Sequence, residues 1–220
     1  KMVFEYIKKM PHGGIHKKLY CFNYRDWCEF LGWFISEGNV YKEKRKQGRF
    51  RIMIAQNHNE KMNLIKSLLQ RMNLKFRHKN NQVEFSNNEI GLHLIKHCGA
   101  GAENKRVPIY LKESTPQMFE VFFDSFVKGD GTTNKKGSRT FFSSSKLLLE
   151  DIQEMFVKIG KAGKLQKTRL KGSVFFIGKR KVIRSNDTYS LYCRQKNTGR
   201  WLEKKIVQKN KSTCIIIEDG

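Results

Sequence analysis

Phe30-Leu-Gly-Trp-Phe-Ile-Ser-Glu-Gly38 is the stretch that decides the fold, because its pattern occurs a second time in the chain. The second copy is Phe123-Asp-Ser-Phe-Val-Lys-Gly-Asp-Gly131. When Glu37 is aligned with Asp130, both segments show an apolar body, small residues four apart, and an acid followed by glycine. Internal repetition is typical of a duplicated structural unit. The alignment therefore predicts two similar halves.

The duplication continues downstream in a second pair of helices. Apolar residues with helical spacing occupy 65–72, and the same pattern returns 87 positions later. Asn57 and Ser144 are suitable N-cap residues before these helices, and Asn73 and Gly160 suit the left-handed turn that ends them. Two separate blocks thus indicate one duplication.

Strand-like sequence lies between and after these helices. In the first half, 40–46 and 49–56 form one expected strand pair, 75–79 and 82–86 form another, and a third helix is expected at 88–97. Each half therefore reads as helix, two strands, helix, two strands, helix. Further strand-like segments of the second half are 173–177, 180–184 and 188–194.

The charge of the chain indicates its partner. The 220 residues include 44 Lys and Arg but only 20 Asp and Glu, so the formal net charge is +24. Folding does not need such a charge, and it favours a polyanionic partner. Nucleic acid fits better than a membrane, because the sequence lacks an apolar stretch of about 18 residues. The absence of a signal peptide and the five scattered cysteines predict reduced thiols in an intracellular protein of the cytoplasm, nucleoid or nucleus. Because the chain starts at Lys1 instead of Met, we expect a fragment of a longer product.

The repeated acids predict a metal site. Gly32 and Gly129 are each four residues from a serine, so each helix carries a stripe of small residues that permits close helix packing. If the two helices pack side by side, Glu37 and Asp130 come together at their C-terminal tips. Two facing carboxylates repel each other unless a divalent cation lies between them, and Mg²⁺ or Mn²⁺ suits such oxygen ligands beside phosphate. An acid followed by glycine is also an ordinary helix end, but two matched copies favour the metal site.

These segments resemble the paired signature of the LAGLIDADG homing endonucleases, in particular the dodecapeptide type found inside inteins. Lys105-Arg-Val-Pro108 resembles the Lys-x-Ile-Pro block that precedes the second signature. The resemblance covers roughly 26–159 well and the rest loosely. The tail at 212–220 resembles the strand that opens the C-terminal splicing block of inteins, but the His-Asn dipeptide that should follow it is absent. We therefore do not expect this chain to splice by itself.

The resemblance implies an α+β fold of two pseudo-symmetric αββαββα halves. The halves would form a pseudo-dimer around the two signature helices, with two antiparallel sheets that lie along DNA. The expected parts are an N-terminal extension at 1–25, a first half at 26–98, a linker at 99–115, a second half at 116–198 and a tail at 199–220.

The resemblance also implies an activity. A monomer would cut both strands of double-stranded DNA at a long site, with Mg²⁺ bound by Glu37 and Asp130. Lys105 would be a basic residue of the active site, and Lys196 lies near the place expected for its symmetric counterpart. The alternative is a non-cleaving nucleic-acid binder of the same fold, such as an intron maturase or a transcription regulator. Retention of both acids favours the nuclease.

The strands supply candidates for contacts with DNA. A strand pair in the major groove reads bases through alternate side chains, with arginine suited to guanine and glutamine to adenine. Others of the set would contact phosphate groups. The candidates are Lys42, Lys44, Lys46, Arg49, Arg51, Gln56, Lys135, Lys136, Arg139, Lys167, Arg169, Arg180, Arg184 and Arg194.

Overall fold

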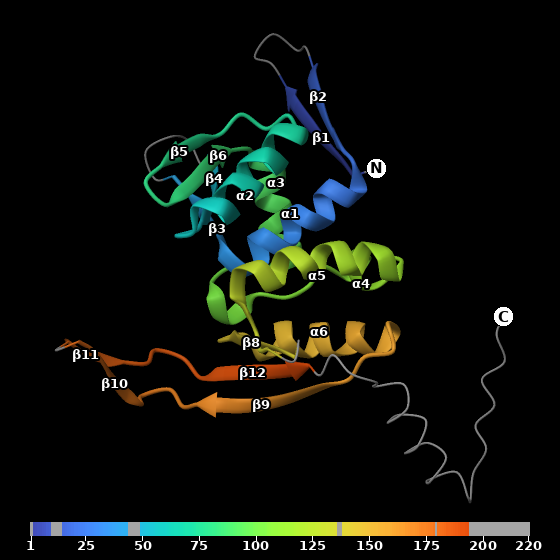
Figure 1. The fold of residues 1–220 in the computed structure, drawn as a ribbon. Coiled ribbons are helices and arrows are strands. Elements are labelled where there is room, and N and C mark those ends of the chain that lie inside the picture. Colours follow the sequence, from blue (N-terminus) through green and yellow to red (C-terminus); the bar gives the residue numbers. More distant parts are fainter. Residues whose placement is uncertain (1, 10–14, 44–48, 136–137, 179, 194–220) are drawn as a thin grey trace, which may run out of the picture.

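Two helices cross the centre of the molecule, and the other elements pack on either side of them (Figure 1). They are α1 (Tyr24–Glu37) and α5 (Pro116–Asp130), and each contains one of the repeated segments. The Asn23 side chain caps α1 by accepting a hydrogen bond from the Arg25 amide, and a proline in the first turn suits the start of α5. The computed structural model describes residues 2–9, 15–43, 49–135, 138–178 and 180–193.

The two central helices touch along their small residues, as the sequence predicts. A Cβ atom on Gly32 would overlap Ser125 Oγ and the Phe122 carbonyl oxygen. A Cβ atom on Gly129 would overlap the Ser36 side chain. Because Gly32 aligns with Ser125 and Ser36 with Gly129, each glycine faces the equivalent position of the other half. This reciprocity is what a pseudo-twofold axis between the halves requires.

The first half has the predicted order of helices and strands. Its four strands form an antiparallel sheet in the order β3-β4-β6-β5. Ile52, Ile54, Val83 and Phe85 are buried beneath the sheet with the helices. The elements are β3 (Gly38–Lys42), β4 (Phe50–Ala55), α2 (Asn59–Arg71), β5 (Arg77–Lys79), β6 (Gln82–Ser86) and α3 (Asn88–Cys98).

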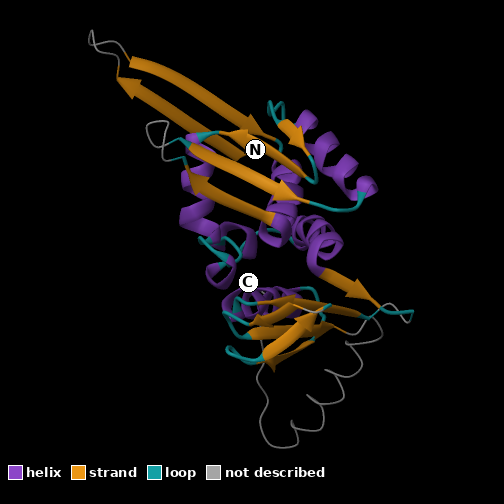
Figure 2. Ribbon diagram, turned by 90° about the vertical axis from the view of Figure 1, so that its left-hand side faces the viewer, coloured by secondary structure: helices purple, strands orange, loops and turns teal. Residues whose placement is uncertain are grey.

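The second half repeats this topology as far as its second strand pair, and the place of a counterpart to α3 lies outside the described residues. Its sheet has the order β7-β8-β12-β9, so each strand occupies the place of its counterpart in the first sheet. A separate two-stranded hairpin, β10 with β11, is inserted between β9 and β12. Figure 2 shows the sheets of the two halves, each of which has four strands. The elements are β7 (Gly131–Thr133), β8 (Arg139–Ser143), α6 (Lys146–Lys158), β9 (Gly163–Arg169), β10 (Val174–Ile177), β11 (Arg180–Ile183) and β12 (Thr188–Cys193).

The ends of the second helix pair are close to those predicted. α2 and α6 each begin one residue later than expected, after His58 and Ser145. Ser145 caps α6 because its side chain accepts a hydrogen bond from a backbone amide in the first turn, whereas His58 makes no side-chain cap. Asn73 and Gly160 have φ values of 52° and 67°, which confirms the left-handed turns after both helices.

Two ordered regions were not predicted. The N-terminal extension contains a hairpin of β1 (Met2–Lys9) and β2 (Ile15–Phe22). The linker contains a short 3₁₀ turn (Ala102–Asn104) and the one-turn helix α4 (Ile109–Lys112). The 3₁₀ turn and α4 are too short to show the periodicity that identifies longer elements. Within the described residues, none of the helices combines the length and the apolar character needed to cross a bilayer.

Candidate active site

Glu37 and Asp130 lie together at the tips of the central helices. They are the last residues of α1 and α5, and a Cβ atom on Gly129 would be 3.1 Å from Glu37 Cγ. Asp130 is exposed at the surface, yet the surrounding protein removes water from its carboxyl group. This loss of hydration and the Glu37 charge raise the pKa of Asp130 to about 7, while Lys105 opposes the shift. The negative ends of both helix dipoles add to the unfavourable charge, so the site attracts a cation.

Lys105 reaches the same place from the linker. Its Nζ donates hydrogen bonds to the backbone carbonyl oxygens of Ile35 at 2.6 Å and Ser36 at 3.2 Å. These carbonyls belong to the last turn of α1, where a cation is favoured. Burial lowers the pKa of Lys105, and the charges of Asp130 and Glu37 oppose that change. Lys105 therefore brings one positive charge to the two acids.

The backbone around Lys105 is fixed by the second half. Ser145 Oγ donates a hydrogen bond to the Lys105 carbonyl oxygen at 2.5 Å. The Val107 amide donates to Asp151 Oδ2 at 3.0 Å, and Lys112 Nζ lies 2.9 Å from Asp151 Oδ1. Ser145 and Asp151 are both buried. The site thus combines α1, α5, the linker and α6.

Gln56 also belongs to this site. It follows β4, is 7% exposed, and its Nε2 donates to Glu37 Oε1 at 3.4 Å. Its Oε1 accepts a hydrogen bond from the His58 amide at 3.0 Å. The sequence placed Gln56 among the residues that read bases, whereas the structure places it beside the acid. The strand register could have revealed this position. Gly38, which follows α1, pairs with Ile54, so Gln56 lies close to the end of α1.

The ligands fit a hard divalent cation. The site offers carboxylate oxygens, and a cation would relieve the repulsion that raises the pKa of Asp130. Mg²⁺ usually takes one or two protein carboxylates and completes its shell with water and substrate phosphate. Among the described residues, groups of three or more His, Cys, Asp and Glu side chains that could hold a metal do not occur. The two carboxylates that lie together, Glu37 and Asp130, could hold such an ion if phosphate oxygens and water completed its shell.

The open face of the first sheet is polar and aromatic. Ile52 and Ile54 point to the helices, so the alternate residues of β4, Arg51 and Met53, point outward. Tyr41 lies opposite Arg51 and is 39% exposed. Arg51 is itself held by ion pairs with Glu43 and with Glu84, the latter at 2.9 Å. Its guanidinium is therefore fixed in one orientation.

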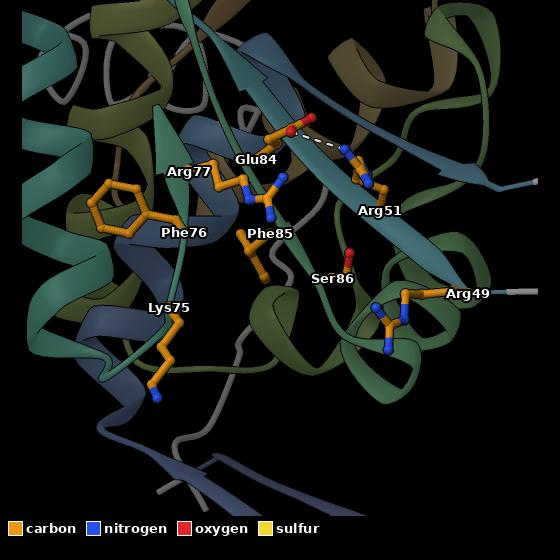
Figure 3. A pocket seen from close by; sticks show the side chains of 8 residues that line it. All are labelled: Arg49, Arg51, Lys75, Phe76, Arg77, Glu84, Phe85 and Ser86. Carbon is orange, nitrogen blue, oxygen red and sulfur yellow. Dashed lines mark hydrogen bonds and ion pairs between the residues drawn. The ribbon is translucent and has the colours of Figure 1, made fainter. Parts of the chain in front are cut away.

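A cationic groove of about 410 Å³ lies at one edge of the first sheet (Figure 3). Arg49, Lys75 and Arg77 bring positive charge to it. Arg49 was predicted from sequence as a DNA contact, but Lys75 and Arg77 were not, although a strand was expected at 75–79. The remaining lining residues are Arg51, Phe76, Glu84, Phe85 and Ser86.

In the second sheet, the strand register places two of the basic residues predicted to contact DNA on the side that faces the helices, not on the open face. Arg139 shares the face of the buried Phe141, and its guanidinium carbon lies 5.5 Å from the centre of the Phe123 ring. Lys167 lies opposite Tyr189 and forms an ion pair with Asp187 at 2.7 Å. Both therefore lie on the helix side. The residues directed outward instead are Thr140, Phe142, Lys164, Gln166 and Tyr192, while Ser190 on the same face is buried.

The remaining predicted cations fall into three groups. Lys42 and Arg169 are exposed at strand ends, and Lys135 is exposed in the turn after β7. Arg180 and Arg184 lie on or beside the inserted hairpin. The last group lies outside the described residues and comprises Lys44, Lys46, Lys136, Arg194 and Lys196.

The fold is that of the LAGLIDADG homing endonucleases. A structure of mesophilic variants of the homing endonuclease I-DmoI superposes with a TM-score of 0.54 at 13% identity, covering 82% of this chain and 94% of that chain. The crystal structure of I-DmoI in complex with DNA and Mn gives a TM-score of 0.52 at 14% identity, covering 88% of this chain and 100% of that chain. Both neighbours support the predicted α+β class of two antiparallel sheets.

Curated relatives in sequence are DNA polymerases. The chain is 27% identical over 138 residues to one from Thermococcus litoralis, which covers 61% of this chain and 8% of the relative. It is 25% identical over 206 residues to one from Thermococcus kodakarensis, which covers 88% of this chain and 12% of the relative. The chain thus spans about a tenth of the length of the polymerases it matches. Protein-family models do not match it.

Proposed function

We propose that this protein is a site-specific endonuclease that cuts double-stranded DNA with the help of Mg²⁺ or Mn²⁺. The observation that carries the proposal is the meeting of Glu37 and Asp130 at two helix tips, beside Lys105. A protein that only binds DNA has no need for two carboxylates at a surface that receives phosphate. The net charge of +24 supports a polyanionic substrate.

Each residue of the site has a proposed role. Glu37 and Asp130 hold the divalent ion, which when bound supplies an activated water and stabilises the leaving oxygen. Gln56 orients the Glu37 carboxylate through its amide. Lys105 contributes positive charge next to the scissile phosphate, and its contacts with the end of α1 fix its position. Lys196 remains the candidate for the equivalent role in the second half.

The two sheets would hold the duplex so that its backbone crosses the helix tips. Outward residues of both sheets then meet base edges in the major groove, where alternate side chains of a strand can read sequence. Arg51 is suited to this because two acids fix its guanidinium. The groove of Arg49, Lys75 and Arg77 suits a phosphate group at the edge of the contact. One chain supplies both halves, so it would act as a monomer.

The polymerase relatives support an intein origin. The matched region is a small part of each polymerase, as expected for an endonuclease segment inserted within a longer protein. The substrate would then be the uninterrupted form of the gene that carries the insertion.

The test is cleavage of a plasmid that contains this uninterrupted gene. With Mg²⁺ we expect one double-strand cut at the insertion point, and with excess EDTA we expect none. A plasmid that carries the interrupted gene is the matched control and should remain uncut, because the insertion divides the target. Tight binding without a cut in Mg²⁺ or Mn²⁺ would instead identify a non-cleaving binder of the same fold.

A further inference from the structure

The inserted hairpin of β10 and β11 has an uncovered apolar face. Val174 lies opposite Ile183 in the register, and Phe176 lies on the same face two residues along. These side chains are 48%, 63% and 67% exposed, and the neighbouring Leu170 is 61% exposed. Single exposed apolar residues are ordinary, but several in one short hairpin mark an interaction surface.

The other face of the hairpin is already covered. Phe175 lies opposite Val182, and the guanidinium carbon of Arg184 lies 4.2 Å from the centre of the Phe175 ring. Both apolar residues are half-buried. An isolated hairpin is marginally stable in water, so a partner on the bare face would also stabilise this one.

The charge of the hairpin indicates what the partner is. Residues 170–184 include five basic residues and no acidic residue. Arg180 and Lys181 are exposed next to the apolar face, and Lys181 lies directly opposite Phe176. A surface that combines bare apolar groups with positive charge alone is complementary to nucleic acid, whose grooves present sugars and methyl groups between rows of phosphates. An acidic protein surface would satisfy the cations but not a strip of apolar side chains this narrow.

The position of the hairpin places this surface beyond the second sheet. In Figure 1 it projects from the left-hand end of β9 and β12, on the side where α1 and α5 end. At the equivalent place the first half has only the turn at Asn80, between β5 and β6. The second half therefore extends further than the first at this end, although the two sheets share one strand order.

We infer that the β10–β11 hairpin is a DNA-binding arm that contacts the duplex outside the segment held by the two sheets, on the second-half side only. Arg180 and Lys181 contact phosphates, and Phe176, Val174 and Ile183 lie against the apolar surface of the groove. The target is consequently longer on one flank than on the other. This inference rests on the proposed function, because it requires the protein to bind double-stranded DNA.

The experiment compares two pairs of substitutions in the full 220-residue chain. One pair is Arg180→Ala with Lys181→Ala, and the other is Phe176→Ser with Ile183→Ser. The probe is a duplex that spans the insertion point of the uninterrupted gene, bound in Ca²⁺ at several salt concentrations and footprinted with hydroxyl radicals. The matched controls are Lys61→Ala with Lys66→Ala, at half-buried positions of α2, and Leu64→Ser with Val157→Ser, at exposed positions of α2 and α6.

Each pair has its own expected signature. Loss of the Arg180 and Lys181 side chains should reduce the slope of log K against log salt by roughly 2, since each phosphate contact contributes about 0.9. Loss of the apolar pair should weaken binding roughly tenfold without changing the slope. Both pairs should remove footprint protection on one flank only, and both control pairs should leave the footprint and the slope unchanged.

The contrary results are distinct. If the unaltered protein binds the duplex and neither hairpin pair changes footprint or slope, the inference is wrong while the proposed function stands. The same holds if the apolar pair only converts a dimer into a monomer in sedimentation, because the face would then serve self-association. If the unaltered protein does not bind the duplex, both the proposed function and the inference fail.

Discussion

Gln56 and Glu37 form the contact on which a single-residue prediction rests. The Gln56 amide reaches Glu37 from the end of β4 and is itself held by the His58 backbone. Replacement Gln56→Ala should lower the cleavage rate at least about tenfold, because residues that orient a metal ligand usually have effects of about 10- to 100-fold. Binding in Ca²⁺ should stay within about twofold. The measurement is a single-turnover cleavage rate alongside a binding titration.

Gln82→Ala is the control for that substitution. Gln82 is on β6 opposite Ala55, and its side chain is not the one that donates to Glu37, so its loss should leave the cleavage rate of bound DNA unchanged. If Gln56→Ala cleaves bound DNA as fast as the unaltered protein, Gln56 does not position Glu37.

At this scale, sequence identified the residues that a repeat or motif marks. Glu37 and Asp130 occur at matched positions, and Lys105 occurs in a recognisable block. Ser145 and Asp151 were not predicted, because their role is to bind the backbone of the linker where it passes α6. That path depends on tertiary packing, which leaves no periodic signal in the sequence.

The central helix pair gives a prediction at the level of elements. A side chain on Gly32 would collide with Ser125 Oγ and the backbone of α5. Gly32→Leu should therefore lower the free energy of unfolding by about 3 kcal/mol or more, at or above the usual cost of overpacking. Ser67→Leu, at an exposed position of α2, should change it by less than about 0.5 kcal/mol. Urea unfolding checks both, and equal stabilities would place the helix contact elsewhere.

The polar contacts between α3 and α4 make stability depend on pH. His93 Nε2 lies 2.9 Å from the Tyr110 hydroxyl, which also accepts a hydrogen bond from Trp27 Nε1 at 3.1 Å. Burial, followed by the charges of His97 and Lys96, lowers the pKa of His93 to about 4. The unfolded histidine titrates near 6.5, so between these values the unfolded chain binds the extra proton. Stability should therefore be lost as pH falls from 6.5 towards 4, by roughly 2 to 3 kcal/mol.

The variant His93→Gln isolates this effect. Unfolding by urea at pH 7 and pH 4.5 should show a smaller loss of stability in the variant than in the unaltered protein. The remaining loss comes from other groups, including His97, whose pKa is also lowered by burial. An identical loss in both proteins would show that His93 does not contribute.

Among the elements, the long and repeated ones were predictable. α1, α2, α3, α5 and α6 have clear helical spacing, and the Asn80 turn fixed the β5–β6 pair, with φ of 53° at Asn80. The β1–β2 hairpin was missed although both strands have eight residues. Consecutive lysines interrupt the alternation of apolar and polar residues in both segments, so the pattern did not distinguish strand from loop.

For the whole molecule, duplication accounts for the similarity of the halves and insertion accounts for their difference. The two sheets have the same strand order, and the helix contact is reciprocal. The β10–β11 hairpin and the N-terminal β1–β2 hairpin occur in one half each. If the chain binds DNA as proposed, it would read an asymmetric target, since its halves offer different side chains on their open faces. The sequence predicted the duplication. Which side chains lie on the open faces of the sheets could be determined only from the strand register in the structure.

The most direct test of the central claim is cleavage by Glu37→Gln and Asp130→Asn, measured beside DNA binding in Ca²⁺. Each substitution keeps the shape of the side chain and removes one carboxylate charge from the shared cation site. We predict that each lowers cleavage by at least about 10³-fold, because metal and phosphate then lose a ligand that stabilises the transition state, while affinity changes by only a few-fold. Cleavage of DNA by both variants at the rate of the unaltered protein would contradict the account.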